Sequence, residues 1–233
     1  TIDQALWRAK ELWATRAMGL SRWPKEHFTV HLEARGARRE VRSPRGSYYA
    51  DPFLLGDWLF LEEFRYALCR GRIVARRVGD DLSLGPVMPA LELSVHCSFP
   101  FVFREGATVC MVPETSHRRT VDLFVCEALP SRWRLARRLL ADIDAADSIL
   151  LQDGGRAWLL TSVLADGKSQ RHLEIYHAES VFSVEWKPHP VNRRRLYGTS
   201  AADLADRHPG ALRHLDVSIW SLGPWLLAVL VHP

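Results

Sequence analysis

The sequence predicts an all-β protein of the propeller type, incomplete with about three clear blades, and preceded by an N-terminal helix. Short strand-like segments between Gly, Asp or Pro turns fill most of the chain from residue 27 to residue 190. Equivalent segments recur at two equal intervals of 48 residues, close to the roughly 40 to 50 residues of one propeller blade. A β-sandwich also has many short strands, but its strands would not recur at equal intervals along the sequence. The equal intervals therefore favour a propeller.

The N-terminal segment changes its periodicity at Pro24. Before it, apolar residues at helical spacing predict a helix over residues 2–19, with Gly19 at its end. After it, the pattern alternates, which predicts strands over residues 27–32 and 38–43 joined by a turn at Gly36.

The repeats start at equivalent first strands headed by Pro52, Pro100 and Ser148. Each first strand is followed by a turn and a second strand, predicted over residues 58–62, 108–112 and 157–161. Third strands follow from residues 71, 121 and 172, and weaker fourth strands from about residues 84, 133 and 184. Each repeat therefore predicts one four-stranded blade.

The chain divides into three parts on this basis. Residues 1–26 form the helix and a linker, residues 27–190 the propeller blades, and residues 191–233 a diverged or truncated tail without clear strand alternation. Three blades leave sheet edges uncovered. We therefore expect the helix, the apolar stretch 218–231 or a second chain to pack on the open side.

Composition argues against several classes of protein. The net charge of +4 and the isoelectric point near 9.0 suggest nucleic acid, but only four of the 31 basic residues are lysines, the arginines are scattered, and no nucleic-acid-binding motif occurs. We predict no nucleic-acid partner. No apolar run reaches about 18 residues, so no integral membrane segment is expected.

The four cysteines predict reduced thiols rather than a metal site. They form no C-x-x-C pair, and no histidine lies at metal-binding spacing from them. We expect a cytoplasmic protein with no metal site and no cofactor.

The candidate site follows from the propeller geometry. The first strand of each blade lines the central channel, so the residue that starts it points toward the axis. This residue is Asp51 in the first repeat, Phe99 in the second and Asp147 in the third. Two carboxylates therefore converge on one funnel from different blades, and we predict catalytic roles for Asp51 and Asp147.

Further candidates lie at the ends of second strands, and one, His96, lies just before the first strand of the second repeat. Glu62 and Glu63 close one strand, and because side chains alternate we expect one to face the core rim and the other solvent. Glu114 either binds a sugar or acts as a catalytic acid, or it belongs to a turn in which Thr115 and Ser116 bond the backbone. His96 either binds a substrate hydroxyl or, as we favour, is a partly buried histidine with a backbone partner.

Two sequence stretches carry a resemblance to a known family. The pieces YADPFLL and LFLEEF, from residues 49–64, and SFPFVF and MVPETS, from residues 98–116, resemble the N-terminal propeller domain of plant glucosamine inositolphosphorylceramide transferases and their bacterial relatives. The resemblance covers roughly residues 27–190. It implies a bacterial, carbohydrate-active domain, distantly similar to the five-bladed propellers of glycoside hydrolase families 43 and 32.

The resemblance also implies roles for individual residues. Asp51 matches an aspartate that serves the hydrolases as base or nucleophile, and Asp147 matches one that positions the sugar and tunes the acid, although Ser148 replaces the usual proline. No residue after 190 matches the acid glutamate of a later blade. The implied function is binding of a carbohydrate or glycoconjugate beside a fused or associated glycosyl- or formyltransferase. From their places at the channel mouth, we predict Glu62, Glu63 and His96 as substrate-binding residues. The alternative is a glycoside hydrolase with Asp51 as base or nucleophile.

Overall fold

The computed structural model describes residues 28–34, 36–165, 170–190 and 192, together with the backbone of three short strands within residues 196–231. In this part of the chain the regular structure consists of β-strands and two short 3-10 turns, η1 (Tyr66–Leu68) and η2 (Ser116–Arg118). The predicted helix at residues 2–19 lies outside the described residues. The all-β class predicted from the sequence is confirmed.

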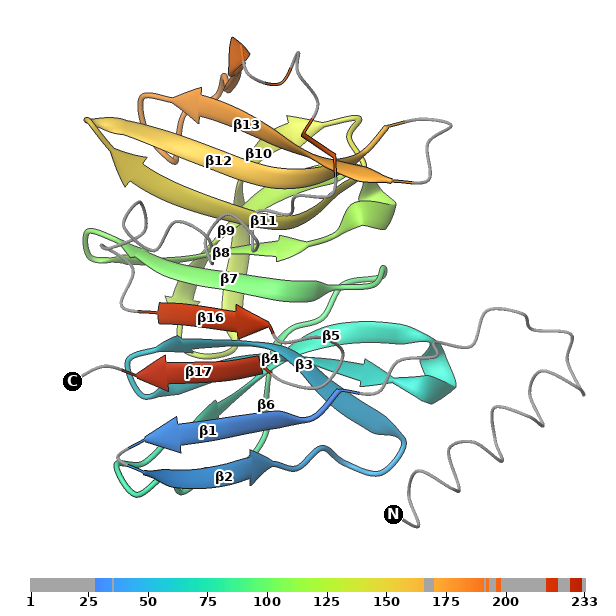
Figure 1. Cartoon of the computed structure of the whole chain (residues 1–233), viewed down its shortest axis with the longest axis vertical. Helices are drawn as coiled ribbons and strands as arrows, with labels where there is room; N and C mark the ends of the chain where they lie inside the picture. The colour runs from blue at the N-terminus through green and yellow to red at the C-terminus, as the bar shows by residue number, and fades with distance from the viewer. Residues whose placement is uncertain are drawn as a thin grey trace, which may run out of the picture.

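Three sheets follow one another along the chain (Figure 1), two of four strands and a third of five strands. Blade one contains β3 (Ser47–Leu55), β4 (Trp58–Arg65), β5 (Arg70–Arg77) and β6 (Met88–Leu91). Blade two contains β7 (Ser98–Glu105), β8 (Thr108–Glu114), β9 (Thr120–Ala128) and β10 (Arg132–Ala141). Blade three contains β11 (Ala145–Asp153), β12 (Arg156–Leu164), β13 (Arg171–Ala178) and β14 (Lys187–Pro188), with β15 (Leu196–Tyr197) also paired to β13. In each blade the strands pair antiparallel in sequence order, as the repeats predict.

A fourth sheet combines strands from the two ends of the chain. It has the order β16-β17-β1-β2 and comprises β1 (Val30–Ala34), β2 (Ala37–Val41), β16 (Val217–Ser221) and β17 (Leu227–Val231). β1 pairs antiparallel with β2 on one side and parallel with β17 on the other. The apolar tail stretch thus covers one edge of the β1–β2 hairpin.

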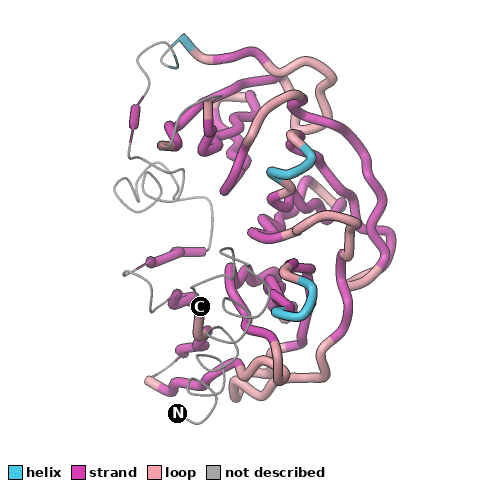
Figure 2. The backbone as a smooth tube through the Cα atoms, turned by 90° about the vertical axis from the view of Figure 1, so that its right-hand side faces the viewer, coloured by secondary structure: helices cyan, strands magenta, loops and turns pink. Residues whose placement is uncertain are grey.

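The four sheets pack face to face in an order that produces the propeller architecture, and Figure 2 shows them along an arc. One apolar cluster joins blades one, two and three, and a second joins the fourth sheet to blade one through residues such as Val30, Leu32 and Leu59. Between blades one and two, the ring of Phe53 meets those of Phe99 and Phe101 at centroid distances of 5.0 and 5.9 Å. Blade one is therefore covered on both of its faces.

Candidate functional site

The first strand of each blade bends at an equivalent residue. Asp51, Phe99 and Asp147 adopt positive φ angles of 47°, 43° and 51°, a conformation uncommon for residues other than glycine. Each lies in a register shift where two residues of the first strand oppose one residue of the second, which is the pattern of a β-bulge. Bulges re-aim side chains, so this repeated feature fixes the directions of the two aspartates.

The register places a second set of carboxyl groups beside the bulges. Glu62 on β4 pairs with Ala50, and Glu114 on β8 pairs with Ser98. The two glutamates therefore occupy equivalent positions in blades one and two, each one pair before the bulge. Asp51, Glu62, Glu114 and Asp147 form what we call the carboxyl cluster, drawn from three blades.

Asp51 is held at the junction between blades one and two. Its Oδ2 accepts a hydrogen bond from the backbone N–H of Phe99 at 3.0 Å. Burial and then the charge of Asp147 raise the pKa of Asp51 to about 6, while hydrogen bonds from Phe99 and Glu62 oppose this rise. The charge of Asp147 on blade three therefore acts on the pKa of Asp51 on blade one.

Glu62 is buried and shares a hydrogen bond with Asp51. Its residue surface is 5% exposed, and burial, followed by the charges of Asp51 and Glu114, raises its pKa well above the ordinary value. The shared bond raises the pKa of Glu62 and lowers that of Asp51. Its Oε1 has no hydrogen-bond partner among the described residues.

Glu114 lies on blade two, and the charge of Asp147 on blade three affects its pKa. Burial, then the charges of Asp147 and Asp51, raise its pKa to about 7, against the opposing effects of Arg171 and the Ser116 hydroxyl. Arg171 is itself paired with Asp144 at 2.8 Å. The carboxyl cluster is therefore only partly balanced by positive charge, and it retains protons at pH values where an exposed carboxyl group has none.

His96 stands beside Glu62 in a neutral form. Its Nδ1 accepts a hydrogen bond from the Gly71 N–H at 2.9 Å, and its Nε2 lies 3.7 Å from Glu62 Oε1. Burial lowers the pKa of His96, and the nearby His117 lowers it further. The ring is thus the partly buried histidine with a backbone partner that the sequence favoured, and a role in substrate binding stays a prediction.

The expectation that one glutamate of the Glu62–Glu63 pair faces solvent is wrong. Both residues are buried, at 5% and 4% exposure. The side chain of Glu63 pairs with Arg72 Nε at 2.8 Å, so it stabilises blade one. The reason is that neighbouring sheets cover both faces of blade one.

Sequence reasoning missed Gly71 and Arg171. A Cβ added to Gly71 would lie 2.3 Å from Glu62 Oε1, so the absence of a side chain there makes room for the Glu62 carboxyl group. Arg171 lies at the start of β13 in blade three, and its charge opposes the rise in the pKa of Glu114 in blade two. Neither residue stands in a motif, and the register between strands would have been needed to find them.

Two further findings concern metals and membranes. Among the described residues, no group of three or more His, Cys, Asp or Glu side chains is arranged to hold a metal ion. In the same part of the chain, no helix is long and apolar enough to span a membrane.

Comparison with solved structures finds glycoside hydrolases of family 43. A xyloglucan-locus GH43B protein of Bacteroides ovatus matches with a TM-score of 0.46 and 11% identity, over 67% of this chain and 34% of that chain. The GH43 protein BlXynB of Bacillus licheniformis matches with a TM-score of 0.46 and 9% identity, over 72% of this chain and 42% of that chain. The propeller assignment itself rests on the strand order and sheet packing described above.

Comparison by sequence gives a more specific result. The chain is 31% identical over 177 residues to glucosamine inositolphosphorylceramide transferase 1 of Arabidopsis thaliana, covering 71% of this chain and 23% of the relative. The protein of the same name from Oryza sativa subsp. japonica is 31% identical over 186 residues, covering 76% of this chain and 24% of the relative. The chain thus spans about a quarter of the length of these plant relatives. The family model for the N-terminal part of glucosamine inositolphosphorylceramide transferase 1 matches residues 34–222, and the chain belongs to this family of N-terminal domains.

Proposed function

We propose that this domain binds a sugar or a glycoconjugate at the carboxyl cluster, and that it serves as an accessory domain to a glycosyltransferase or a formyltransferase. The observation that carries the proposal is the repeated bulge that places Asp51 and Asp147 at equivalent positions, with Asp51 bonded to the Phe99 N–H of blade two at 3.0 Å. Burial and other members of the carboxyl cluster raise the pKa of Asp51, Glu62 and Glu114. The aspartates occupy the bulge position of blades one and three. The glutamates occupy the pair before the bulge in blades one and two.

The protonation states of the cluster suit sugar hydroxyl groups. A hydroxyl group both donates and accepts hydrogen bonds, so it needs partners of both kinds. The raised pKa of Glu62 favours its protonated form, which can donate a hydrogen bond, whereas an ionised carboxylate accepts only. A cluster that retains some of its protons near neutral pH offers both.

The family supports the association with a transferase. The relatives bear the name of a transferase, and this chain covers about a quarter of each relative. We infer that the transferase activity resides in a fused or associated partner, and that the propeller presents a carbohydrate or glycoconjugate to it.

A glycoside hydrolase is the second candidate, and the pair of raised pKa values favours it. Burial and neighbouring carboxylates raise the pKa of Asp51 to about 6 and that of Glu114 to about 7, which suits a general base and a general acid near neutral pH. In this mechanism Asp51 acts as base or nucleophile, and Glu114 protonates the leaving oxygen. Hydrolysis requires the two groups to flank the glycosidic bond.

The test is a glycan-binding screen with the wild-type domain, followed by Asp51→Asn and Asp147→Asn on each ligand found. We expect each variant to bind between roughly 5 and 150 times more weakly, because a buried hydroxyl group loses its charged acceptor. Asp142→Asn is the matched control, since Asp142 is exposed and has a similar positive φ of 58°. The control should bind as the wild type does.

A hydrolysis assay on the same ligands separates the two functions. Turnover that disappears in Asp51→Asn while binding persists identifies the enzyme. Loss of binding in a protein without turnover identifies the recognition domain. Wild-type affinity in both Asp51→Asn and Asp147→Asn contradicts a ligand at the carboxyl cluster.

A further inference from the structure

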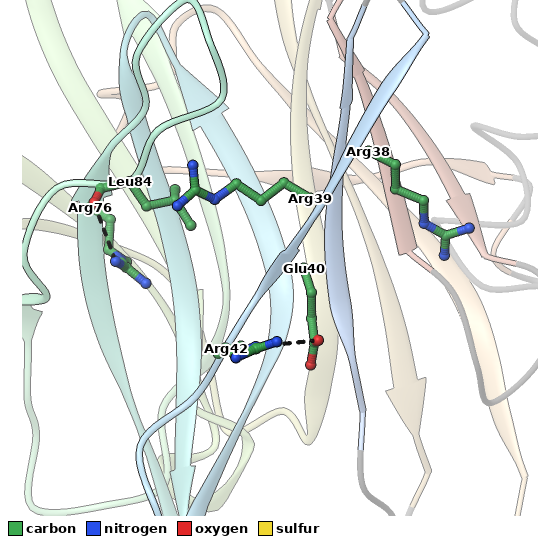
Figure 3. A pocket seen from close by; sticks show the side chains of 6 residues that line it. All are labelled: Arg38, Arg39, Glu40, Arg42, Arg76 and Leu84. Atoms are coloured by element: carbon green, nitrogen blue, oxygen red, sulfur yellow. Dashed lines mark hydrogen bonds and ion pairs between the residues drawn. The ribbon is translucent and has the colours of Figure 1, made fainter.

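A second group of charged side chains lies on a different part of the molecule, where β2 of the fourth sheet faces blade one. They line a pocket of about 440 Å³, shown in Figure 3. Its lining residues are Arg38, Arg39, Glu40, Arg42, Arg76 and Leu84. We call this site the arginine pocket. It is independent of the carboxyl cluster and of the function proposed for it.

The arginine pocket has more positive charge than its own carboxylates balance. Four arginines line it with a single glutamate. Arg42 pairs with Glu40 at 3.6 Å, and Arg38 pairs with Glu33 at 3.2 Å. Hydrogen bonds from Ser83 lower the pKa of the exposed Asp81 carboxyl group, and Arg39 lies near enough to lower it further. Among the described residues, neither Arg39 nor Arg76 is within ion-pair distance of a carboxylate, so both guanidinium groups can attract an anion.

The backbone holds Arg76 in place. Its Nε donates to the Gly85 carbonyl oxygen at 2.8 Å, and its Nη2 donates to the Leu84 carbonyl oxygen at 3.4 Å. A guanidinium group has five N–H donors in one plane, so two such bonds fix its orientation and leave three donors for a ligand. Ordering this side chain in advance reduces the entropic cost of binding.

Arg39 reaches into the pocket from the opposite wall. In Figure 3 its side chain extends from β2 toward Leu84 and Arg76, whereas Arg38 points to the other side of the strand, as alternation along a strand requires. β2 is an edge strand of its sheet, and an edge strand has backbone N–H groups without ladder partners. The pocket therefore has a guanidinium group on each of two walls, Arg39 from β2 and Arg76 from β5.

We propose that the arginine pocket binds a phosphate group, either that of a soluble phosphate compound or that of a lipid headgroup. A phosphate has several oxygen atoms, which can accept paired N–H donors from Arg39 and Arg76 together.

The test uses titration calorimetry of the wild-type domain with inorganic phosphate at low chloride concentration. We expect saturable binding that weakens about tenfold or more in Arg39→Gln. Arg39→Lys should restore only part of the affinity, because lysine keeps the charge but loses the planar pair of donors. Arg104→Gln, at an exposed arginine on β7, removes the same charge elsewhere and should bind phosphate as the wild type does.

Co-sedimentation with vesicles distinguishes the two sources of phosphate. Binding to phosphatidylglycerol–phosphatidylcholine vesicles that is lost in Arg39→Gln and retained in Arg104→Gln identifies a lipid headgroup. Binding of inorganic phosphate without binding to these vesicles identifies a soluble phosphate compound. The proposal is overturned if neither probe binds in a manner that depends on Arg39, or if Arg104→Gln weakens binding as much as Arg39→Gln does.

Discussion

Replacing Gly71 with alanine is expected to lower the free energy of unfolding by about 1 to 3 kcal/mol, the usual cost of overpacking a well-packed site. The added Cβ would lie 2.3 Å from Glu62 Oε1 and 2.8 Å from the Cys97 carbonyl oxygen. The glutamate side chain can move, but the carbonyl oxygen belongs to a backbone segment whose Cys97 N–H donates to the Gly71 oxygen at 3.2 Å. β5 and the segment before β7 must therefore separate. Urea unfolding at constant pH measures this loss.

Gly85→Ala is the matched control for this substitution. Gly85 belongs to the same blade, and the nearest atom to its added Cβ is Arg77 Cβ at 3.4 Å, which is an ordinary contact. We expect the unfolding free energy of this variant to stay within about 0.5 kcal/mol of the wild type. Equal losses in the two alanine variants would show that the crowding at Gly71 is not the cause.

The arrangement of the three blades could be predicted because its signal is local in the sequence. First strands at equal intervals of 48 residues correspond to the three bulges at Asp51, Phe99 and Asp147. The position of the fourth sheet could not be predicted in this way. β1 and β17 pair through Val30 and Leu227, and no local periodicity connects segments so far apart in the chain.

The carboxyl cluster could be predicted only in part for a related reason. The propeller geometry pointed to the two aspartates, because the start of a first strand faces the axis in every blade. Glu62 lies beside Asp51 because of the register between β3 and β4. This register cannot be determined from the sequence pattern alone. Glu63 was misjudged because alternation assigns one face of a strand to solvent, whereas a sheet stacked between two others has no solvent face.

The second large effect concerns pH, and we expect the contribution of the carboxyl cluster to the free energy of unfolding to fall as pH rises from about 4 to about 8. In the unfolded chain, Asp51 and Glu114 titrate near their ordinary values of 3.8 and 4.5, whereas in the folded domain burial and neighbouring charges raise their pKa values to about 6 and about 7. Between these values the folded state holds protons that the unfolded state has released, so a rise in pH favours unfolding. Below about pH 4 both states are protonated and the effect vanishes.

Asp147→Asn is expected to reduce this pH dependence. After burial, the charge of Asp147 raises the pKa of both Asp51 and Glu114 more than any other charge does. Its removal therefore moves both pKa values back toward their ordinary range. One pKa unit corresponds to about 1.4 kcal/mol. We therefore expect the variant to gain on the order of 1 to 2 kcal/mol over the wild type at pH 8 and almost nothing at pH 4. Asparagine also tolerates the left-handed conformation at this position.

Urea unfolding of both proteins at pH 4, 6 and 8 tests this expectation, because the difference at each pH cancels the contributions of other groups such as His96. Asp142→Asn again serves as the control, since it removes one negative charge from an exposed residue with positive φ. Its difference from the wild type should not change with pH. If Asp147→Asn gave the same pH dependence as the wild type, the aspartates would not be coupled through the centre of the propeller. A gain that is nearly absent at pH 4, present at pH 6 and largest at pH 8, seen in Asp147→Asn and absent from Asp142→Asn, is the result that the raised pKa values of Asp51 and Glu114 require.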